Sequence, residues 1–313
     1  MYNPDSHNDK MSAAIQDAEL VCKVGFGVLD FIRKHPNECR IPEYKNISQL
    51  MLQMALVKLE SIITLVKHPI ELQADGHRVS YVDPMSLVST ERSLYELLVV
   101  HHTIFVQNKT TDQKEIAIKV WENAGLSNRK NILPEESLNE EARKVMDHDS
   151  RVIESNNKFI RESRLYKSLD EKGRNKINDS CKKLKPIYFV EDQSTISVCQ
   201  VSFADAYKIL YPNNAADGVS MAQYKKMSFQ SHPSYLGILQ FGQQMGAPDC
   251  FWSEPVTSSA HFCAKLIKEV VSIIPETLST LLDLERENIN IISIVGNDSI
   301  TQLDKQINGK STI

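Results

Sequence analysis

Glycine is scarce in this sequence, with 11 among 313 residues, roughly half its usual share. Because tight turns depend on glycine, a meander of many short strands is disfavoured and long helices are favoured. Hydrophobic residues make up 42% and charged residues 24%, which excludes a wholly disordered chain. A chain of this length can bury a substantial core, as one large domain or as two smaller ones.

The cysteines show no C-x-x-C pair and no tight clustering with histidine; they are Cys22, Cys39, Cys181, Cys199, Cys250 and Cys263. This spacing supports neither a zinc site nor a dense disulfide framework, so we expect no metal and no cofactor. Residues 1–9 lack the basic and apolar regions of a signal peptide. No apolar run approaches the roughly 20 residues that span a bilayer. We therefore expect a cytoplasmic protein that does not enter a membrane.

The formal net charge is −4, which argues against wholesale electrostatic capture of nucleic acid or anionic lipid. One stretch departs from this average, because residues 158–185 hold ten Lys or Arg residues against four acids. Such a run is either a solvated helical surface and connector or a strip that contacts phosphates. The second interpretation predicts weak RNA contact through residues 158–185.

Apolar residues at helical spacing predict most of the elements. The expected helices cover about 11–34, 44–67, 84–107, 112–123, 134–166, 202–211, from 220 onward, and 257–288. The second is apolar around most of its circumference, so we expect it to lie central in a bundle. The third has Asp83 as its N-cap and Pro84 at its first position. It is the most apolar of all, so we expect the helix around residues 84–107 to be central too. The fold class is therefore all-α.

Several boundaries depend on single residues. The first two helices should end at His35-Pro36 and His68-Pro69, because a residue before proline is pushed out of the helical region. Gly125 should close the fourth helix, and Pro275 should kink the last one. Residues 186–190 could form a strand or an extended loop. We expect one helical domain over residues 1–300, a sub-boundary near 168–200 and a flexible tail over 301–313.

The long helix opened by Pro134 is mostly polar. Its apolar stripe is a heptad-like column of Leu138, Val145, Val152, Phe159 and Tyr166. A stripe this narrow predicts a helix that docks along one edge of the bundle or projects outward.

Arg92 and Glu96 are the first polar residues out of place in an apolar helix. They are four residues apart, so their side chains can meet. Apolar residues on both sides of the helix predict that it is enclosed, and an unpaired buried charge costs several kcal/mol. The pair is either an internal ion pair that fixes how helices meet, or Arg92 contacts an anion or substrate.

The second polar locus runs from Tyr224 to Tyr235 and supplies the candidate ligand-binding residues Ser228, Ser231, His232 and Tyr235. A serine and a histidine can form a nucleophile–base pair. However, no G-x-S-x-G elbow surrounds either serine. The alternative is a helix end before Pro233, with Ser234 capping the next helix. That alternative leaves His232 unexplained.

A third candidate is the pair Arg143 and His148 in the long polar helix. HEPN ribonucleases carry an Arg followed, after four to six residues, by a His, and this pair has that spacing. Roughly one such match is expected by chance in a chain with this many arginines and histidines. The slot after the Arg, small and polar in that family, holds Lys144 here.

Residues 89–96, with sequence Ser-Thr-Glu-Arg-Ser-Leu-Tyr-Glu, resemble the Arg- and Glu-bearing helix of an uncharacterised bacterial all-helical family. Residues 224–232 resemble that family's other shared segment, and the likeness covers about residues 45–285. The resemblance implies an all-α fold, a pairing of the two loci and an architecture comparable to HEPN-type domains.

Two hypotheses about function stay open. In the first, the protein binds an unknown protein or small ligand through the polar locus, with a homo-oligomer as one arrangement. In the second, it is a HEPN-like ribonuclease of a toxin or phage-defence system. Its catalytic residues would then be Arg92, Glu96 and His232, or else Arg143 and His148.

Overall fold

The computed structural model describes residues 5–37, 39, 43–74, 77–132, 139–192, 195–212, 221–231, 238–239, 241 and 252–278. Helices dominate these residues, which confirms the all-α prediction. The chain divides into two compact units, one made of Met1–Val99 with Ile209–Ile313 and the other of Val100–Lys208. The single helical domain over residues 1–300 stays a prediction, because a division into compact units does not show whether the chain folds as one cooperative domain. The predicted tail, 301–313, lies outside the described residues.

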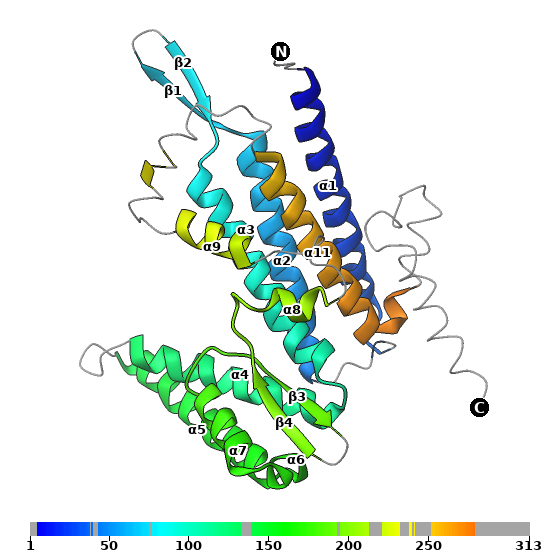
Figure 1. Cartoon of the computed structure of the whole chain (residues 1–313), viewed down its shortest axis with the longest axis vertical. Coiled ribbons are helices and arrows are strands. Elements are labelled where there is room, and N and C mark those ends of the chain that lie inside the picture. The colour runs from blue at the N-terminus through cyan, green and yellow to red at the C-terminus, as the bar shows by residue number, and fades with distance from the viewer. Residues whose placement is uncertain are drawn as a thin grey trace, which may run out of the picture. The chain divides into compact units, whose positions relative to one another are not determined.

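The first unit is built on three helices that pack against one another, α1 (Asp5–Lys34), α2 (Glu43–Lys67) and α11 (Ser253–Ile273) (Figure 1). Both α1 and α2 end next to a His-Pro pair, as predicted. The helices α1 and α2 approach closely at Gly25, where an added Cβ would lie 2.5 Å from Leu56 Cδ2. Glycine at this position therefore sets the spacing of the two helices.

The prediction that α2 is central is wrong for one of its faces. Leu50, Met54 and Val57 are each more than half exposed, because α1 and α11 cover the opposite side. Between Tyr44 and Lys67, α2 is long and apolar enough, by length and composition, to cross a membrane, with a mean hydropathy of 1.4. This result differs from the sequence expectation of no membrane-spanning segment. That expectation counted uninterrupted apolar runs, whereas the mean hydropathy also includes the polar residues between those runs. A core helix passes the same test.

A β-hairpin follows α2 and was not predicted. Its strands are β1 (Ile70–Ala74) and β2 (His77–Tyr81), paired antiparallel with Ala74 opposite His77. Two residues, Asp75-Gly76, connect the strands in the sequence. An Asp-Gly pair between alternating polar and apolar residues is a strong hairpin signal, so the sequence did contain the information.

Helix α3 (Pro84–His101) begins as predicted. Met85 N donates to Asp83 Oδ1 at 3.0 Å, which makes Asp83 the N-cap. A π-helix, η1 (His102–Gln107), continues it, so the helical range 84–107 is confirmed. The buried ring of Tyr95 lies 5.6 Å from the Phe262 ring of α11 and 5.6 Å from the Tyr224 ring. Tyr224 belongs to α9 (Met221–Gln230), so both α9 and α11 contact α3.

The second unit contains α4 (Thr111–Ile132), α5 (Glu140–Glu162), α6 (Arg164–Ser168) and α7 (Glu171–Ser180). A hairpin of β3 (Ile187–Asp192) and β4 (Thr195–Gln200) completes it, before the short α8 (Tyr207–Leu210) (Figure 1). Of the two alternatives for residues 186–190, a strand or an extended loop, the structure has a strand from Ile187 onward. The buried Asn108 amide donates to Ile187 O at 3.2 Å and accepts from Phe189 N at 3.1 Å. This side chain ties η1 to β3.

Two predictions for the second unit are wrong. Gly125 does not end α4, which continues to Ile132, because a glycine inside a helix costs only about 1 kcal/mol. Arg129 in the added turns makes a two-pronged ion pair with Asp149 of α5. The heptad column is also offset from the buried face of α5, since Asn156 and Ile160 are buried and Phe159 is exposed. The helix docks through polar contacts, with Asn156 Nδ2 donating to Asn123 Oδ1 at 3.1 Å.

Other boundaries move by a few residues. Helix α5 begins at Glu140 with Asn139 as its N-cap and ends at Glu162, so the predicted start at Pro134 is outside the described residues. Helix α11 begins at Ser253, four residues earlier than expected. It ends at Ile273, and Pro275–Thr277 form a 3-10 turn rather than the kink of a longer helix.

Candidate functional site

The two polar loci identified in the sequence meet in the first unit. Arg92 Nε donates to Glu96 Oε1 at 2.8 Å, within α3. The Nη1 atom of Arg92 donates to Ser231 Oγ at 3.1 Å, one residue past the end of α9. Tyr224 Oη donates to Glu96 Oε1 at 3.1 Å. Arg92, Glu96, Tyr224 and Ser231 therefore form one network between α3 and α9, which we call the α3–α9 network.

The α3–α9 network is partly open to solvent. The side chains of Arg92 and Glu96 keep 20% and 29% exposure, so the expectation of a fully enclosed pair is wrong. Burial lowers the pKa of Arg92, but the contacts with Glu96 outweigh it and the pKa is raised. Burial, and next the charge of Glu96, raise the pKa of Tyr224, so its hydroxyl stays protonated. The network therefore holds α9 against α3, and its polar groups already have hydrogen-bond or ion-pair partners.

The remaining candidates from the sequence lie at three different places. Ser228 lies on α9, half-buried, and its carbonyl accepts from Ser231 Oγ at 3.3 Å. His232 and Tyr235 lie outside the described residues, so a contact between Arg92 and His232 stays a prediction. Arg143 and His148 are exposed on α5 in the second unit. Over the described ranges, no group of three or more His, Cys, Asp or Glu could hold a metal ion.

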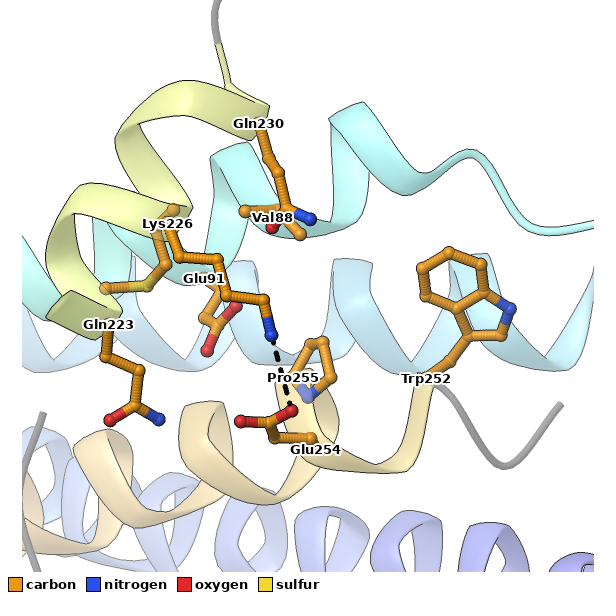
Figure 2. Close-up of a pocket in the computed structure, with 9 residues that line it drawn as sticks. Val88, Glu91, Gln223, Lys226, Gln230, Trp252, Glu254 and Pro255 are labelled. Carbon is orange, nitrogen blue, oxygen red and sulfur yellow. Dashed lines mark ion pairs between the residues drawn. The ribbon is translucent and has the colours of Figure 1, made fainter. Parts of the chain in front are cut away.

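A small hollow lies between α3, α9 and the start of α11, and we call it the Glu91 hollow. Helix α3 contributes Val88 and Glu91, α9 contributes Lys226 and Gln230, and the α11 end contributes Trp252 and Glu254 (Figure 2). Its volume is about 20 Å³. A cavity needs about 10–15 Å³ to hold one water, so this one accepts a single water-sized group.

Glu91 is the buried carboxyl of the hollow, with 6% of its surface exposed. Ser258 Oγ on α11 donates to Glu91 Oε1, and no donor to Oε2 is found among the described residues. Burial raises the pKa of Glu91 to about 7, an effect that the Ser258 hydrogen bond partly offsets. The carboxyl is therefore poised between its two protonation states at neutral pH.

Gln230 adds a second buried polar group, with 7% exposure. Its side-chain amide has no hydrogen-bond partner within the part of the chain that the structure describes. The atoms of this amide are not fully enclosed, because Ser259 Oγ is the one enclosed side-chain polar atom without a partner among the described residues. The Glu91 hollow therefore contains hydrogen-bonding capacity that an additional group would use.

The rim of the hollow carries one loose ion pair. Lys226 Nζ lies 3.6 Å from Glu254 Oε2, and the two side chains are 48% and 62% exposed. Figure 2 shows Lys226 reaching from α9 toward Glu254, with Glu91 behind it on α3. Ion pairs this exposed contribute only about 0–1 kcal/mol. Breaking the ion pair between Lys226 and Glu254 at the rim therefore costs little free energy.

A larger groove in the same unit has a different character. It measures about 680 Å³ and is bordered by Ile15, Val66 and Ser80, together with Glu19 and Lys67. The ammonium group of Lys67 already donates to the Glu19 carboxylate, and both side chains are exposed. Among the described residues that border this groove, no polar side chain is buried, in contrast to the Glu91 hollow.

No family model, curated protein or solved structure matches the chain. The resemblance based on residues 89–96 and 224–232 therefore stays a prediction. Any functional conclusion has to rest on the geometry of the site.

Proposed function

We propose that this protein is a binding protein that holds a small polar group of a ligand or partner in the Glu91 hollow. The observation that supports this most is the pairing of Glu91 and Gln230. Both side chains are more than nine-tenths buried, both border the same hollow, and both keep unused hydrogen-bonding capacity. Concave sites with a few converging polar groups are the usual places for ligand recognition.

The size of the hollow limits what enters it. A volume of about 20 Å³ accommodates a head group and not a whole metabolite, since pockets for drug-sized ligands measure about 300–1,000 Å³. The rest of the ligand would lie at the rim, beside Lys226 and Glu254. This arrangement suits a side chain or a small molecule that presents one terminal group.

The chemistry of the site favours binding over turnover. A carboxyl with a pKa near 7 can act as a general base. Nucleophilic catalysis also needs a nucleophile activated by that base and a third group that orients the base. Ser258 Oγ, the hydroxyl beside Glu91, also lies 2.9 Å from Glu254 O. Within the described residues the hollow offers no histidine, and its second carboxyl, Glu254, is paired with Lys226 at the rim.

Trp252 provides a direct test because it borders the hollow and is one of only two tryptophans. Trp121→Phe removes the other, which lies on α4 in the second unit. Ammonium, acetate and acetamide are then titrated while the fluorescence of Trp252 is recorded. We expect at least one of them to change the emission saturably, and Glu91→Gln with Gln230→Leu to abolish that response.

Gln53→Leu, on the exposed face of α2, is the matched control for an amide replaced by an apolar side chain. It should leave the response unchanged. The proposal fails if the folded Trp121→Phe variant responds to none of the three probes.

A further inference from the structure

We infer that the Glu91 hollow is a site for a primary ammonium group, and that Lys226 occupies its rim as an internal competitor. This inference rests on the proposed function, because it names the chemical class that the same site accepts. The group belongs either to a free amine or to a lysine side chain of a partner, since both present the same head group.

The charges around the hollow favour a cation. Glu91 from α3 and Glu254 from α11 face it with two carboxyl groups, while α9 contributes one ammonium, that of Lys226. The amide oxygen of Gln230 is a further acceptor. An ammonium group offers three N–H donors and no acceptor, which matches the free Oε2 of Glu91 and the Gln230 amide. An anion would instead meet two carboxyl groups.

The volume of the hollow selects among cations. About 20 Å³ suits a group the size of a water molecule, and an ammonium head is of that size. A planar guanidinium or a quaternary ammonium is larger and would have to displace side chains. The site should therefore discriminate primary amines from arginine-like and choline-like cations.

The geometry of Lys226 explains why it competes without filling the site. Its Nζ is 3.6 Å from Glu254 Oε2, longer than a hydrogen-bonded ion pair, and the side chain is about half exposed. It extends across the rim from α9, over Glu91 (Figure 2). An incoming ammonium would pair with the carboxylates and leave Lys226 in solvent, which is a small loss because an ion pair this exposed is weak.

The experiment uses methylammonium chloride with the Trp121→Phe variant at constant ionic strength. We expect a saturable change in Trp252 emission, and binding at least about tenfold weaker for guanidinium and for tetramethylammonium, which exceed a water-sized hollow. Lys226→Met should tighten methylammonium binding by about 2- to 5-fold, since it removes one exposed competing ion pair. Glu91→Gln should abolish binding.

Lys225→Met is the matched control, because Lys225 is the exposed neighbour on the same helix and does not border the hollow. It changes the net charge by the same amount and should leave the affinity unchanged. Gln230→Leu tests the site a second time if Glu91→Gln fails to fold. N-acetyl-lysinamide represents a partner's lysine side chain, and 1,4-diaminobutane represents a free amine. The compound that binds more tightly identifies the source of the ammonium group.

Three results would overturn the ammonium assignment while the proposed function stands. These are binding of acetate in place of methylammonium, weaker binding in Lys226→Met, and equal tightening in Lys226→Met and Lys225→Met. Methylammonium binding that survives both Glu91→Gln and Gln230→Leu would also overturn it. A lack of response to every probe, acetamide included, defeats the proposed function itself.

Discussion

Arg92 on α3 donates a hydrogen bond of 3.1 Å to the hydroxyl of Ser231, 139 residues further along the chain. Ser231 Oγ in turn donates to Met227 O at 2.7 Å, so the contact anchors the last turn of α9. Gln230 lies on that turn and Lys226 directly precedes it, and both border the Glu91 hollow. The α3–α9 network therefore sets the position of one wall of the site without forming part of it.

The first prediction concerns the stability that the α3–α9 network provides. Arg92→Leu should lower the free energy of unfolding by about 1–2 kcal/mol, because a partly exposed ion pair and its hydrogen bonds are lost. Adding Glu96→Leu should recover part of the loss, since Glu96 is then not left without its cation. Urea unfolding measures both values. Arg143→Leu on the exposed side of α5 is the control, and an equal effect there would contradict the role assigned to Arg92.

The second prediction concerns pH and follows from Glu91. Its pKa is 4.5 in the unfolded chain and about 7 in the folded protein, so the folded state holds the proton more tightly. Stability from this group is fully present below pH 4.5 and is lost as the pH rises to about 7. At about 1.4 kcal/mol per pH unit, the loss reaches roughly 3 kcal/mol.

Glu91→Gln has no carboxyl to ionise and should not show this loss. Its free energy of unfolding should therefore rise relative to wild type between acidic and neutral pH, as measured by denaturant titrations across that range. Glu154→Gln, on the exposed side of α5, is the control and should follow the wild-type curve. Parallel curves for wild type and Glu91→Gln would show that the carboxyl does not titrate as stated.

The third prediction concerns the α4–α5 interface. Asp149 is buried and Arg129 is about half exposed, so the two partners are not equivalent. Arg129→Ala leaves a buried charge uncompensated and should cost about 3 kcal/mol, whereas Asp149→Ala leaves an exposed cation and should cost less. Thermal unfolding compares them, with the exposed neighbour Lys130→Ala as the control. Equal costs would mean that burial of Asp149 does not decide the energetics.

Features fixed by neighbouring residues could be predicted from the sequence. Helix ends before His-Pro pairs and the Asp83 cap follow from steric and hydrogen-bonding rules over a few residues. Glu91 was missed although its spacing from Leu87, Leu94 and Leu98 places it in the apolar stripe of α3. That signal shows a buried carboxyl, but not what covers it, because Ser258 and Gln230 approach from helices distant in the sequence.

The face of α5 could not be predicted for a related reason. Apolar periodicity marks Val145 and Phe159, yet Asp149 and Asn156 are buried, together with the apolar Ile160. Helix α4 presents polar groups to α5, and Asn123 pairs there with Asn156. Polar side chains are buried where a partner satisfies them, and the identity of that partner is a property of the fold.

The last prediction separates the binding proposal from the ribonuclease hypothesis. Arg161, Arg164 and Lys172 are exposed on α5, α6 and α7, within the basic stretch 158–185. Electrostatic contact of this kind should give weak RNA binding that falls steeply as salt rises, through release of counterions. We expect purified protein to show no cleavage of RNA.

Cleavage of labelled RNA is measured with wild-type protein, His148→Ala and His232→Ala. This comparison distinguishes the binding proposal from the ribonuclease hypothesis. A general acid or base contributes about 10²- to 10⁴-fold to the rate, so loss of a catalytic histidine would abolish cleavage and leave RNA binding nearly intact. Robust cleavage by wild type that one of these substitutions removes would favour the ribonuclease and identify its site. Binding without cleavage in all three proteins agrees with a site whose charged groups, Arg92 and Glu96, are engaged with each other and with α9.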